Sequence, residues 1–277
     1  MARRVAAAGH SVTVWNRTAS VADDLAGSTP GTVVAASVAD AVRDSDVVLS
    51  MLADGDITCA VLLDSAVVSV MRPGLVVVDL ATSGVDASRR LAAGVGATGA
   101  SFVDAPVSGS VPAVEAGTLL VMASGPADAI DAASPVLGSF ARKVLRVGDA
   151  GAGQAMKLAV NLVVHGLNAA VSESLVLAEN AGISRESAYD VLQESVVGAP
   201  FVLYKRAAFL DPATPVAMSL DLVLKDLRLI TSFGDEVEAP TEVTDAVRDA
   251  VQAAVTAGHG GEDMAALSRA LRPSSLS

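Results

Sequence analysis

The sequence of 277 residues has little of several residue types that mark particular classes of protein. Its one cysteine, Cys59, excludes an internal disulfide framework and a cysteine-rich metal site. No spacing of His, Cys, Asp and Glu indicates a metal. Lysine and arginine form no dense run and the formal net charge is -12, so neither nucleic acid nor a membrane is expected as a partner. No apolar signal core follows Arg3 and Arg4, and we expect a cytoplasmic protein.

The composition is 52% hydrophobic, which is enough for a sizeable core, and the length suits two domains. Short Val-rich runs alternate with helical stretches over residues 1–148, a pattern typical of βαβ units and a mostly parallel sheet. Residues 149–277 show only long helical patterns. The sequence therefore predicts an α/β domain over 1–148 and an all-helical domain over 149–277.

The pattern predicts seven strands and five helices in the first domain after a short N-terminal helix that ends at Gly9. The expected strands are Ser11–Asn16, Thr32–Ala35, Asp46–Leu52, Leu75–Ala81, Ser101–Asp104, Thr118–Ala123 and Lys143–Val147. The expected helices are Ala19–Ala26, Ser37–Arg43, Ile57–Met71, Asp86–Val95 and Ala127–Phe140.

One long helix is expected from Gly151 to Gly182, with apolar residues nearly all round and one polar stripe. At about 100° per residue, the stripe gathers Lys157, Asn161, His165, Asn168 and Ser172 on one side. A lysine in such a stripe must be paired, line a wet cleft, or have a shifted pKa. Lys157 therefore marks a candidate site, and the alternative is a lysine that begins the helix and reaches water. His165 is expected to be an interior histidine with a partner.

Two loops follow predicted strands at the edge where open α/β sheets bind ligands. Ser108, Gly109 and Ser110 form a tight turn of small residues, whose backbone amides and hydroxyls suit an anion, although such a turn is commonly only a turn. Thr82 follows another strand, where capping of the next helix is the alternative.

The first predicted strand is followed by Asn16-Arg17-Thr18 in place of an acidic residue. In a dinucleotide-binding unit this turn contacts the adenosine ribose, and Arg17 and Thr18 suit a 2′-phosphate. The expected opening strand and G-x-G-x-x-G turn are not found ahead of it, so an ordinary polar turn is the alternative.

Three ordered motifs, DAPVSGS at 104–110, GAGQAMKLAVN at 151–161 and KDL at 225–227, resemble those of the β-hydroxyacid dehydrogenase family. This family includes 3-hydroxyisobutyrate dehydrogenases and glyoxylate/succinic semialdehyde reductases. The resemblance implies a Rossmann-type domain joined by the long helix to an all-α domain like that of 6-phosphogluconate dehydrogenase. It also implies a homodimer or a dimer of dimers.

The resemblance implies a hydride transfer between a nicotinamide cofactor and a small carboxylate-bearing substrate. The implied cofactor is NADP, and NAD is the alternative. The resemblance makes Lys157 the general acid and base, which suits the alkoxide that hydride delivery develops. Asn161 is implied to hold the substrate. The implied substrate-binding residues are Ser108, Gly109 and Ser110, and the implied cofactor-binding residues are Asn16, Arg17, Thr18, Leu52, Thr82 and Lys225.

The sequence departs from the family pattern at three places. Ser110 replaces a glycine, and Ala53 stands where relatives often have proline. Relatives also carry a first strand and a G-x-G-x-x-G turn ahead of the segment that matches Met1-Ala2, so we expect an N-terminally truncated chain whose sheet lacks a central strand.

Two alternatives to the hydroxyacid enzyme remain open. An imine reductase shares the fold, but members of that group usually carry Asp or Tyr in place of Lys157. A non-catalytic dinucleotide-fold scaffold agrees with the missing glycine turn, whereas Lys157, Asn161 and Lys225 speak against it.

Overall fold

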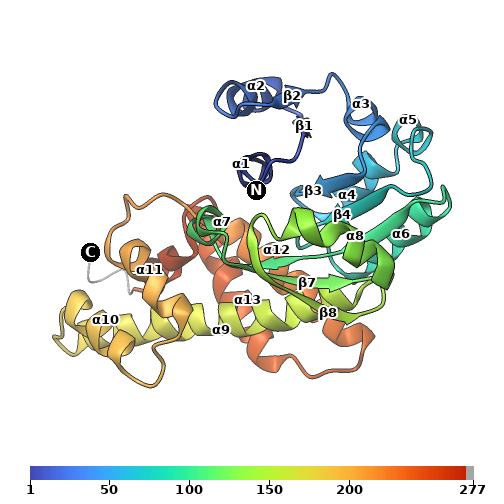
Figure 1. The fold of residues 1–277 in the computed structure, drawn as a ribbon. Coiled ribbons are helices and arrows are strands. Elements are labelled where there is room, and N and C mark those ends of the chain that lie inside the picture. Colours follow the sequence, from blue (N-terminus) through green and yellow to red (C-terminus); the bar gives the residue numbers. More distant parts are fainter. Residues whose placement is uncertain (273–277) are drawn as a thin grey trace. The chain divides into compact units, whose positions relative to one another are not determined.

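The computed structural model of the chain describes residues 1–272. These residues form two compact units, an N-terminal unit from Met1 to Lys157 and a C-terminal unit from Leu158 onward. The division falls within helix α9, Ala152–Asn180 (Figure 1). The chain therefore combines an α/β unit with a helical unit, and the predicted fold class is confirmed.

The N-terminal unit contains two separate sheets. Strands β1 and β2 pair only with each other, in parallel, while β3, β4, β5 and β7 follow one another in a sheet of six strands in which β6 and β8 both pair with β7. Two pairings are antiparallel, β5 with β7 and β6 with β7, and the rest are parallel. The strands are β1 Val12–Val14, β2 Thr32–Val34, β3 Val47–Ser50, β4 Val76–Asp79, β5 Ser101–Asp104, β6 Val107–Ser108, β7 Leu119–Ser124 and β8 Ala141–Gly148.

Helices cover both faces of the six-stranded sheet. Val78 of β4 packs in one core with Ile130 of α8, and the preceding residue, Val77, packs in the opposite core with Leu91 of α6. Such alternation requires a strand buried on both faces, and all four residues of β4 are buried. The helices of this unit are α1 Ala2–Ala7, α2 Ala19–Gly27, α3 Val38–Arg43, α4 Gly55–Leu62, α5 Ser65–Val68, α6 Val85–Gly96, α7 Val111–Ala116 and α8 Ala127–Leu137.

Two differences from the expected elements have local causes. The helix expected over Ile57–Met71 is divided, because the Asp64 side chain accepts a hydrogen bond from the Ala66 amide and starts α5 as its N-cap. The two-residue strand β6 and the short helix α7 were not predicted, since neither is long enough to show periodicity.

The C-terminal unit packs its helices around one apolar core. Tyr189 and Phe209 lie at its centre, with ring centroids 5.5 Å apart, and the Tyr189 hydroxyl donates to the Val202 carbonyl. The elements are the rest of α9, α10 Arg185–Glu194, α11 Pro200–Leu210, α12 Leu220–Glu236, α13 Glu242–Ala254, a π-helical turn Val255–His259, a 3-10 turn Met264–Ala266 and α14 Leu267–Ala270.

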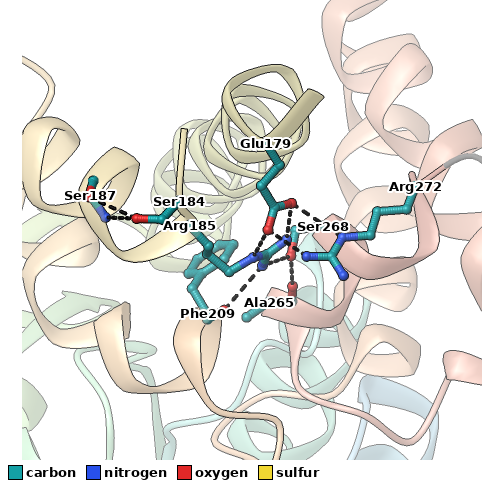
Figure 2. A network of polar contacts seen from close by, with 8 residues as sticks. All are labelled: Glu179, Ser184, Arg185, Ser187, Phe209, Ala265, Ser268 and Arg272. Atoms are coloured by element: carbon teal, nitrogen blue, oxygen red, sulfur yellow. Dashed lines mark hydrogen bonds and ion pairs between the residues drawn. The ribbon is translucent and has the colours of Figure 1, made fainter. Parts of the chain in front are cut away.

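An arginine at the start of α10 joins four parts of this unit (Figure 2). The Arg185 guanidinium donates to both carboxylate oxygens of Glu179 near the end of α9, and also to the Phe209 carbonyl and the Ser268 hydroxyl. Arg272 binds the same carboxylate, and Arg185 with Arg272 holds the pKa of Glu179 below its usual range. The network joins the last turns of α9 and α11 and the first residue of α10 to α14.

A buried ion pair also stabilises this unit. Lys205 of α11 donates to both oxygens of Asp263 at 2.8 Å, and their side chains are only 4% and 10% exposed. Asp263 also accepts from the Ala217 and Ala265 amides. Burial disfavours the carboxylate, but Lys205 and these amides outweigh it and keep the pKa of Asp263 below its ordinary value.

Helix α9 is long and apolar enough to cross a membrane by length and composition. Its polar stripe is nevertheless buried, with Asn161, His165, Asn168 and Ser172 each at most 5% exposed. Asn168 donates to the Met264 carbonyl, so the stripe has partners within the C-terminal unit, as in the core helix of a folded domain.

Not every apolar residue of α9 is buried. Met156, Val163 and Leu177 are 41%, 64% and 73% exposed, and Ala170 between the last two is also exposed. These four residues are spaced by seven along the helix and therefore form one apolar stripe on its surface. We call this set the exposed stripe of α9.

Candidate functional site

The predicted anion loop lies between β6 and α7. Gly109 has a φ of +132°, and an added Cβ atom would stand 2.6 Å from Cδ2 of Leu119, so no other residue fits without strain. Ser108 ends β6 and Ser110 precedes α7, and neither hydroxyl has a hydrogen-bond partner in the described part of the chain. The loop therefore presents two half-buried hydroxyls beside a glycine whose backbone is open to approach.

The start of α9 is clamped to the carboxyl ends of β4 and β5. Gln154 is fully buried, and its side-chain oxygen accepts from the Ser83 and Gly84 amides, while its nitrogen donates to the Ala81 carbonyl and to Asp104. These four bonds use the whole capacity of the side-chain amide.

Asp104 completes this clamp from the end of β5. Its second carboxylate oxygen accepts the Gln154 backbone amide and the Ser124 hydroxyl. Burial raises the pKa of Asp104, and the bonds from Gln154 and Ser124 oppose that rise. Gly153 permits the close approach, since a Cβ atom there would meet the Met122 carbonyl oxygen at 2.6 Å.

The clamp was not identified from the sequence. Asp104 and Gln154 belong to the motifs that carried the family resemblance, but their sequence separation hides the contact. A signal was present in the pattern, because a polar residue that ends a buried strand needs a partner inside the protein.

Helix α9 carries Lys157 one turn beyond Gln154, and Asn161 one turn beyond Lys157. Residues four apart on a helix share a face, so the lysine and the amide are neighbours on α9. Lys157 is half-buried and Asn161 is 5% exposed. The clamp thus fixes the first turn of the helix that carries Lys157.

Within the C-terminal unit, Asn161 meets a buried carboxylate of α12. Its side-chain nitrogen donates to Oδ2 of Asp226 at 2.7 Å, and Nε2 of His165 lies 3.6 Å from the same oxygen. Nζ of Lys225 is 3.1 Å from Oδ1. Burial disfavours the Asp226 carboxylate, but His165 and Lys225 outweigh burial and lower its pKa. Lys225 also lines a surface pocket of about 500 Å³ together with Arg228 and Gln252.

The expected partner of His165 is found only in part. Its ring is fully buried, yet neither ring nitrogen makes a hydrogen bond among the described residues, and the 3.6 Å approach to Asp226 is too long for one. His165 is therefore a neighbour of a charge and not a hydrogen-bonded interior histidine.

The predicted cofactor-binding residues of the N-terminal unit follow three different strands. After β1, Asn16 accepts the Thr18 amide through its side chain, Thr18 precedes α2, and Arg17 is exposed with no ion pair in the described chain. Leu52 and Thr82 follow β3 and β4, and both are half-buried. An exposed guanidinium after β1 is a donor that a phosphate group could use.

A pyrophosphate needs backbone amides at the start of a helix, as a glycine-rich turn provides them. The described helix α1, Ala2–Ala7, contains no glycine, so it offers no such turn. The spacing G-x-G-x-x-G does occur at Gly94–Gly99, but there it ends α6 and leads into β5, where a helix presents carbonyl groups instead of amides. The described residues therefore fit the adenosine end of a dinucleotide better than its phosphates. No group of three or more His, Cys, Asp or Glu within residues 1–272 could hold a metal ion.

Comparison with known families covers nearly the whole chain. Residues 1–148 match the family described as the NAD binding domain of 6-phosphogluconate dehydrogenase. Residues 151–271 match the family described as the NAD-binding domain of NADP-dependent 3-hydroxyisobutyrate dehydrogenase.

Individual relatives agree with these matches. Glyoxylate/succinic semialdehyde reductase 1 of Arabidopsis thaliana is 30% identical over 95% of this chain and 91% of its own length. The chloroplastic reductase 2 of the same plant is 29% identical over 98% of this chain and 76% of its own length. The cytokine-like nuclear factor N-PAC of Mus musculus is 30% identical over 95% of this chain, which spans 47% of that protein.

Solved structures show the same fold. A 3-hydroxyisobutyrate dehydrogenase from Salmonella typhimurium has a TM-score of 0.89 at 26% identity, covering 97% of this chain and 94% of its own. The Mycobacterium tuberculosis 3-hydroxyisobutyrate dehydrogenase with L-serine has a TM-score of 0.84 at 29% identity, with coverages of 98% and 94%. An imine reductase from a Pseudomonas species has a TM-score of 0.66 at 26% identity, with the same coverages.

Proposed function

Since the chain belongs to the β-hydroxyacid dehydrogenase family of NAD(P)-dependent oxidoreductases, we propose that it interconverts a small β-hydroxyacid and its semialdehyde or keto form, with Lys157 as general acid and base. The observation that carries this proposal is the placement of Lys157 and Asn161 on one face of α9. A proton donor and a hydrogen-bonding amide on the same face can act on one substrate, the first at its carbonyl oxygen and the second as a group that orients it.

In reduction, the nicotinamide cofactor supplies the hydride when it is bound. The Lys157 ammonium donates a proton to the carbonyl oxygen as negative charge develops there, and its positive charge stabilises that oxygen before the proton moves. In oxidation, neutral Lys157 takes the hydroxyl proton. Asn161 orients the substrate, and the Ser108–Ser110 loop binds its carboxylate through two hydroxyls and the open backbone at Gly109.

The substrate class follows from the donors available. The loop offers neutral donors for one carboxylate, and the relatives named glyoxylate/succinic semialdehyde reductase act on small carbonyl acids by name. L-Serine, which accompanies the Mycobacterium tuberculosis structure, is also a small carboxylic acid, with a hydroxyl group on its third carbon. We therefore propose a carboxylate with a carbonyl or hydroxyl group one or a few carbons away.

NADP is the proposed cofactor, and NAD the alternative. Arg17 is exposed, has no ion pair among the described residues and follows β1, where a 2′-phosphate would lie. Thr82 and Leu52 are proposed to contact the dinucleotide and Lys225 to border it.

The proposed assembly is a homodimer in which α9 of one copy faces another copy. The exposed stripe of α9, defined above, supports this proposal, because apolar residues at a spacing of seven suit packing against a second helix. A second copy supplies an equally apolar surface.

Activity measurements test the proposal directly. The purified chain is assayed with NADPH against glyoxylate, succinic semialdehyde and a cyclic imine, and with NADP⁺ against 3-hydroxyisobutyrate and L-serine. Lys157→Ala should lower kcat by about a hundredfold or more, the usual effect of a positioned general acid. Lys143→Ala, at an exposed lysine of β8, is the matched control and should leave kcat unchanged.

Three results would contradict the proposal. Turnover by Lys157→Ala within about threefold of wild type, across pH 6 to 9, would remove its acid–base role. Turnover of the cyclic imine alone would favour the imine reductase, and an inactive wild type would favour a scaffold.

A further inference from the structure

Asp226 is a buried carboxylate that the proposed chemistry does not yet use. It is 2% exposed and lies on α12, and three polar side chains of the C-terminal unit approach it. Asn161 and His165 come from α9, and Lys225 precedes it on α12. A buried carboxylate costs free energy unless such partners satisfy it. Its placement between two residues assigned to substrate and cofactor therefore calls for an explanation.

The contact with Asp226 determines how Asn161 is presented. An ionised carboxylate only accepts hydrogen bonds, so the atom 2.7 Å from Oδ2 must be the amide nitrogen of Asn161. This assigns which terminal atom of the Asn161 amide is nitrogen and which is oxygen, and it fixes the orientation of the amide. What Asn161 has left to offer is its oxygen and one N–H bond.

His165 supports the same carboxylate from one turn further along α9. Its side chain is fully buried and its Nε2 atom lies 3.6 Å from Oδ2. At that distance it encloses Asp226 without competing with Asn161 for a hydrogen bond. The Asn161 nitrogen therefore has the shortest contact with Oδ2, while Lys225 stands beside Oδ1.

We infer that Asp226 is a positioning residue for the reaction: it orients the Asn161 amide toward the substrate, with His165 closing the contact from the interior. This inference rests on the proposed function. A merely structural carboxylate would change stability alone, whereas a positioning residue changes substrate KM through Asn161.

The first variant is Asp226→Asn, which keeps the shape of the side chain. An amide at this position can turn its oxygen toward either Asn161 or Lys225, and its NH₂ group then faces the other donor. One of the two contacts is lost in either orientation. We expect substrate KM at saturating NADPH to rise about tenfold, with kcat changed less, and the NADPH Kd from fluorescence titration to stay within about threefold.

The matched control is Asn168→Ala. Asn168 lies two turns beyond Asn161 on the same stripe, is 1% exposed, and donates to the Met264 carbonyl. Loss of that bond should lower the urea midpoint while KM stays within about twofold of wild type.

A second pair keeps the inference testable if Asp226→Asn folds poorly. The double variant Asn161→Asp with Asp226→Asn restores one amide and one carboxylate in exchanged positions. Its urea midpoint should return toward wild type, but KM should stay high, because a carboxylate now faces the substrate.

Each outcome decides the question. A wild type that turns over none of the compounds overturns the proposed function and this role together. An active wild type with Asp226→Asn indistinguishable from Asn168→Ala in KM overturns only the positioning role. Recovery of KM by the exchanged pair, or an NADPH Kd that rises as steeply as KM, overturns it as well.

Discussion

Replacing Lys205 by methionine should destabilise the C-terminal unit more than any surface substitution. Methionine keeps the length of the side chain but leaves the Asp263 carboxylate without its ammonium partner, with only backbone amides as donors. Breaking a buried pair from one side costs about 3–5 kcal/mol. With a urea m-value of about 2 kcal/mol/M, the midpoint should fall by about 1.5–2.5 M at pH 7.

The pH dependence of this loss has a definite sign. In the wild type the folded pKa of Asp263 is lowered, so its contribution is complete above the ordinary value of 3.8 and is lost as the pH falls through the lowered pKa. In Lys205→Met burial is offset only by the backbone amides and no longer by the ammonium, so the pKa of Asp263 should rise. The variant therefore regains stability as the pH falls toward 4, and the difference in free energy of unfolding between the two proteins narrows.

Urea titrations followed by far-UV circular dichroism at pH 7 and pH 4 measure both effects. Arg206→Met is the control, since Arg206 follows Lys205 on α11 and pairs with Asp190 at the surface, and its midpoint should not change. The double variant Lys205→Met with Asp263→Asn removes the buried charge and should recover most of the loss. A midpoint for Lys205→Met equal to that of Arg206→Met, or a difference that does not narrow at pH 4, would refute the reasoning.

Three further predictions concern the cofactor, the loop and the assembly. Wild type should prefer NADPH to NADH by about tenfold or more in kcat/KM, and Arg17→Ala should remove the preference, because a charge-assisted contact contributes about 1.5–3 kcal/mol; an unchanged ratio argues against the 2′-phosphate contact. Gly109→Ala should raise substrate KM about tenfold through strain at a positive φ, whereas Gly166→Ala, where a Cβ meets open space, should leave KM unchanged; equal KM values would exclude the loop from binding. Val163→Asp should convert a dimer to a monomer in sedimentation velocity, and a wild type that is already monomeric contradicts the assembly.

The long helix shows how far periodicity reaches. Its expected limits, Gly151 and Gly182, differ from the observed Ala152–Asn180 by one residue and two residues, and the polar stripe lies in the interior as expected. What periodicity could not decide is which apolar residues are covered. Val163 and Leu177 look like core residues in the sequence but lie at the surface. Hydrophobicity alone does not tell which apolar residues of a helix are buried.

The sequence predicted candidate site residues by type and spacing, but it did not predict their contacts. Lys157 and Asn161 are one turn apart by sequence alone, whereas the bond from Asn161 to Asp226 joins positions 65 residues apart. The same holds for Gln154 and Asp104, 50 residues apart. Short-range spacing is fixed by helix geometry, and long-range pairing depends on packing that a single sequence does not display.

The isolation of the β1–β2 pair affects how the N-terminal unit responds to a ligand. Two three-residue strands that pair only with each other share few ladder hydrogen bonds, and Val33 of β2 is 62% exposed. A sheet this small should open at a lower free energy than the buried strand β4, and its amides should exchange with deuterium sooner. The turn Asn16–Thr18 projects from this pair. Part of the binding free energy of any ligand held there is therefore used in ordering β1 and β2. Slower hydrogen exchange of the Val12–Val14 amides should be the most sensitive sign that the ligand has bound.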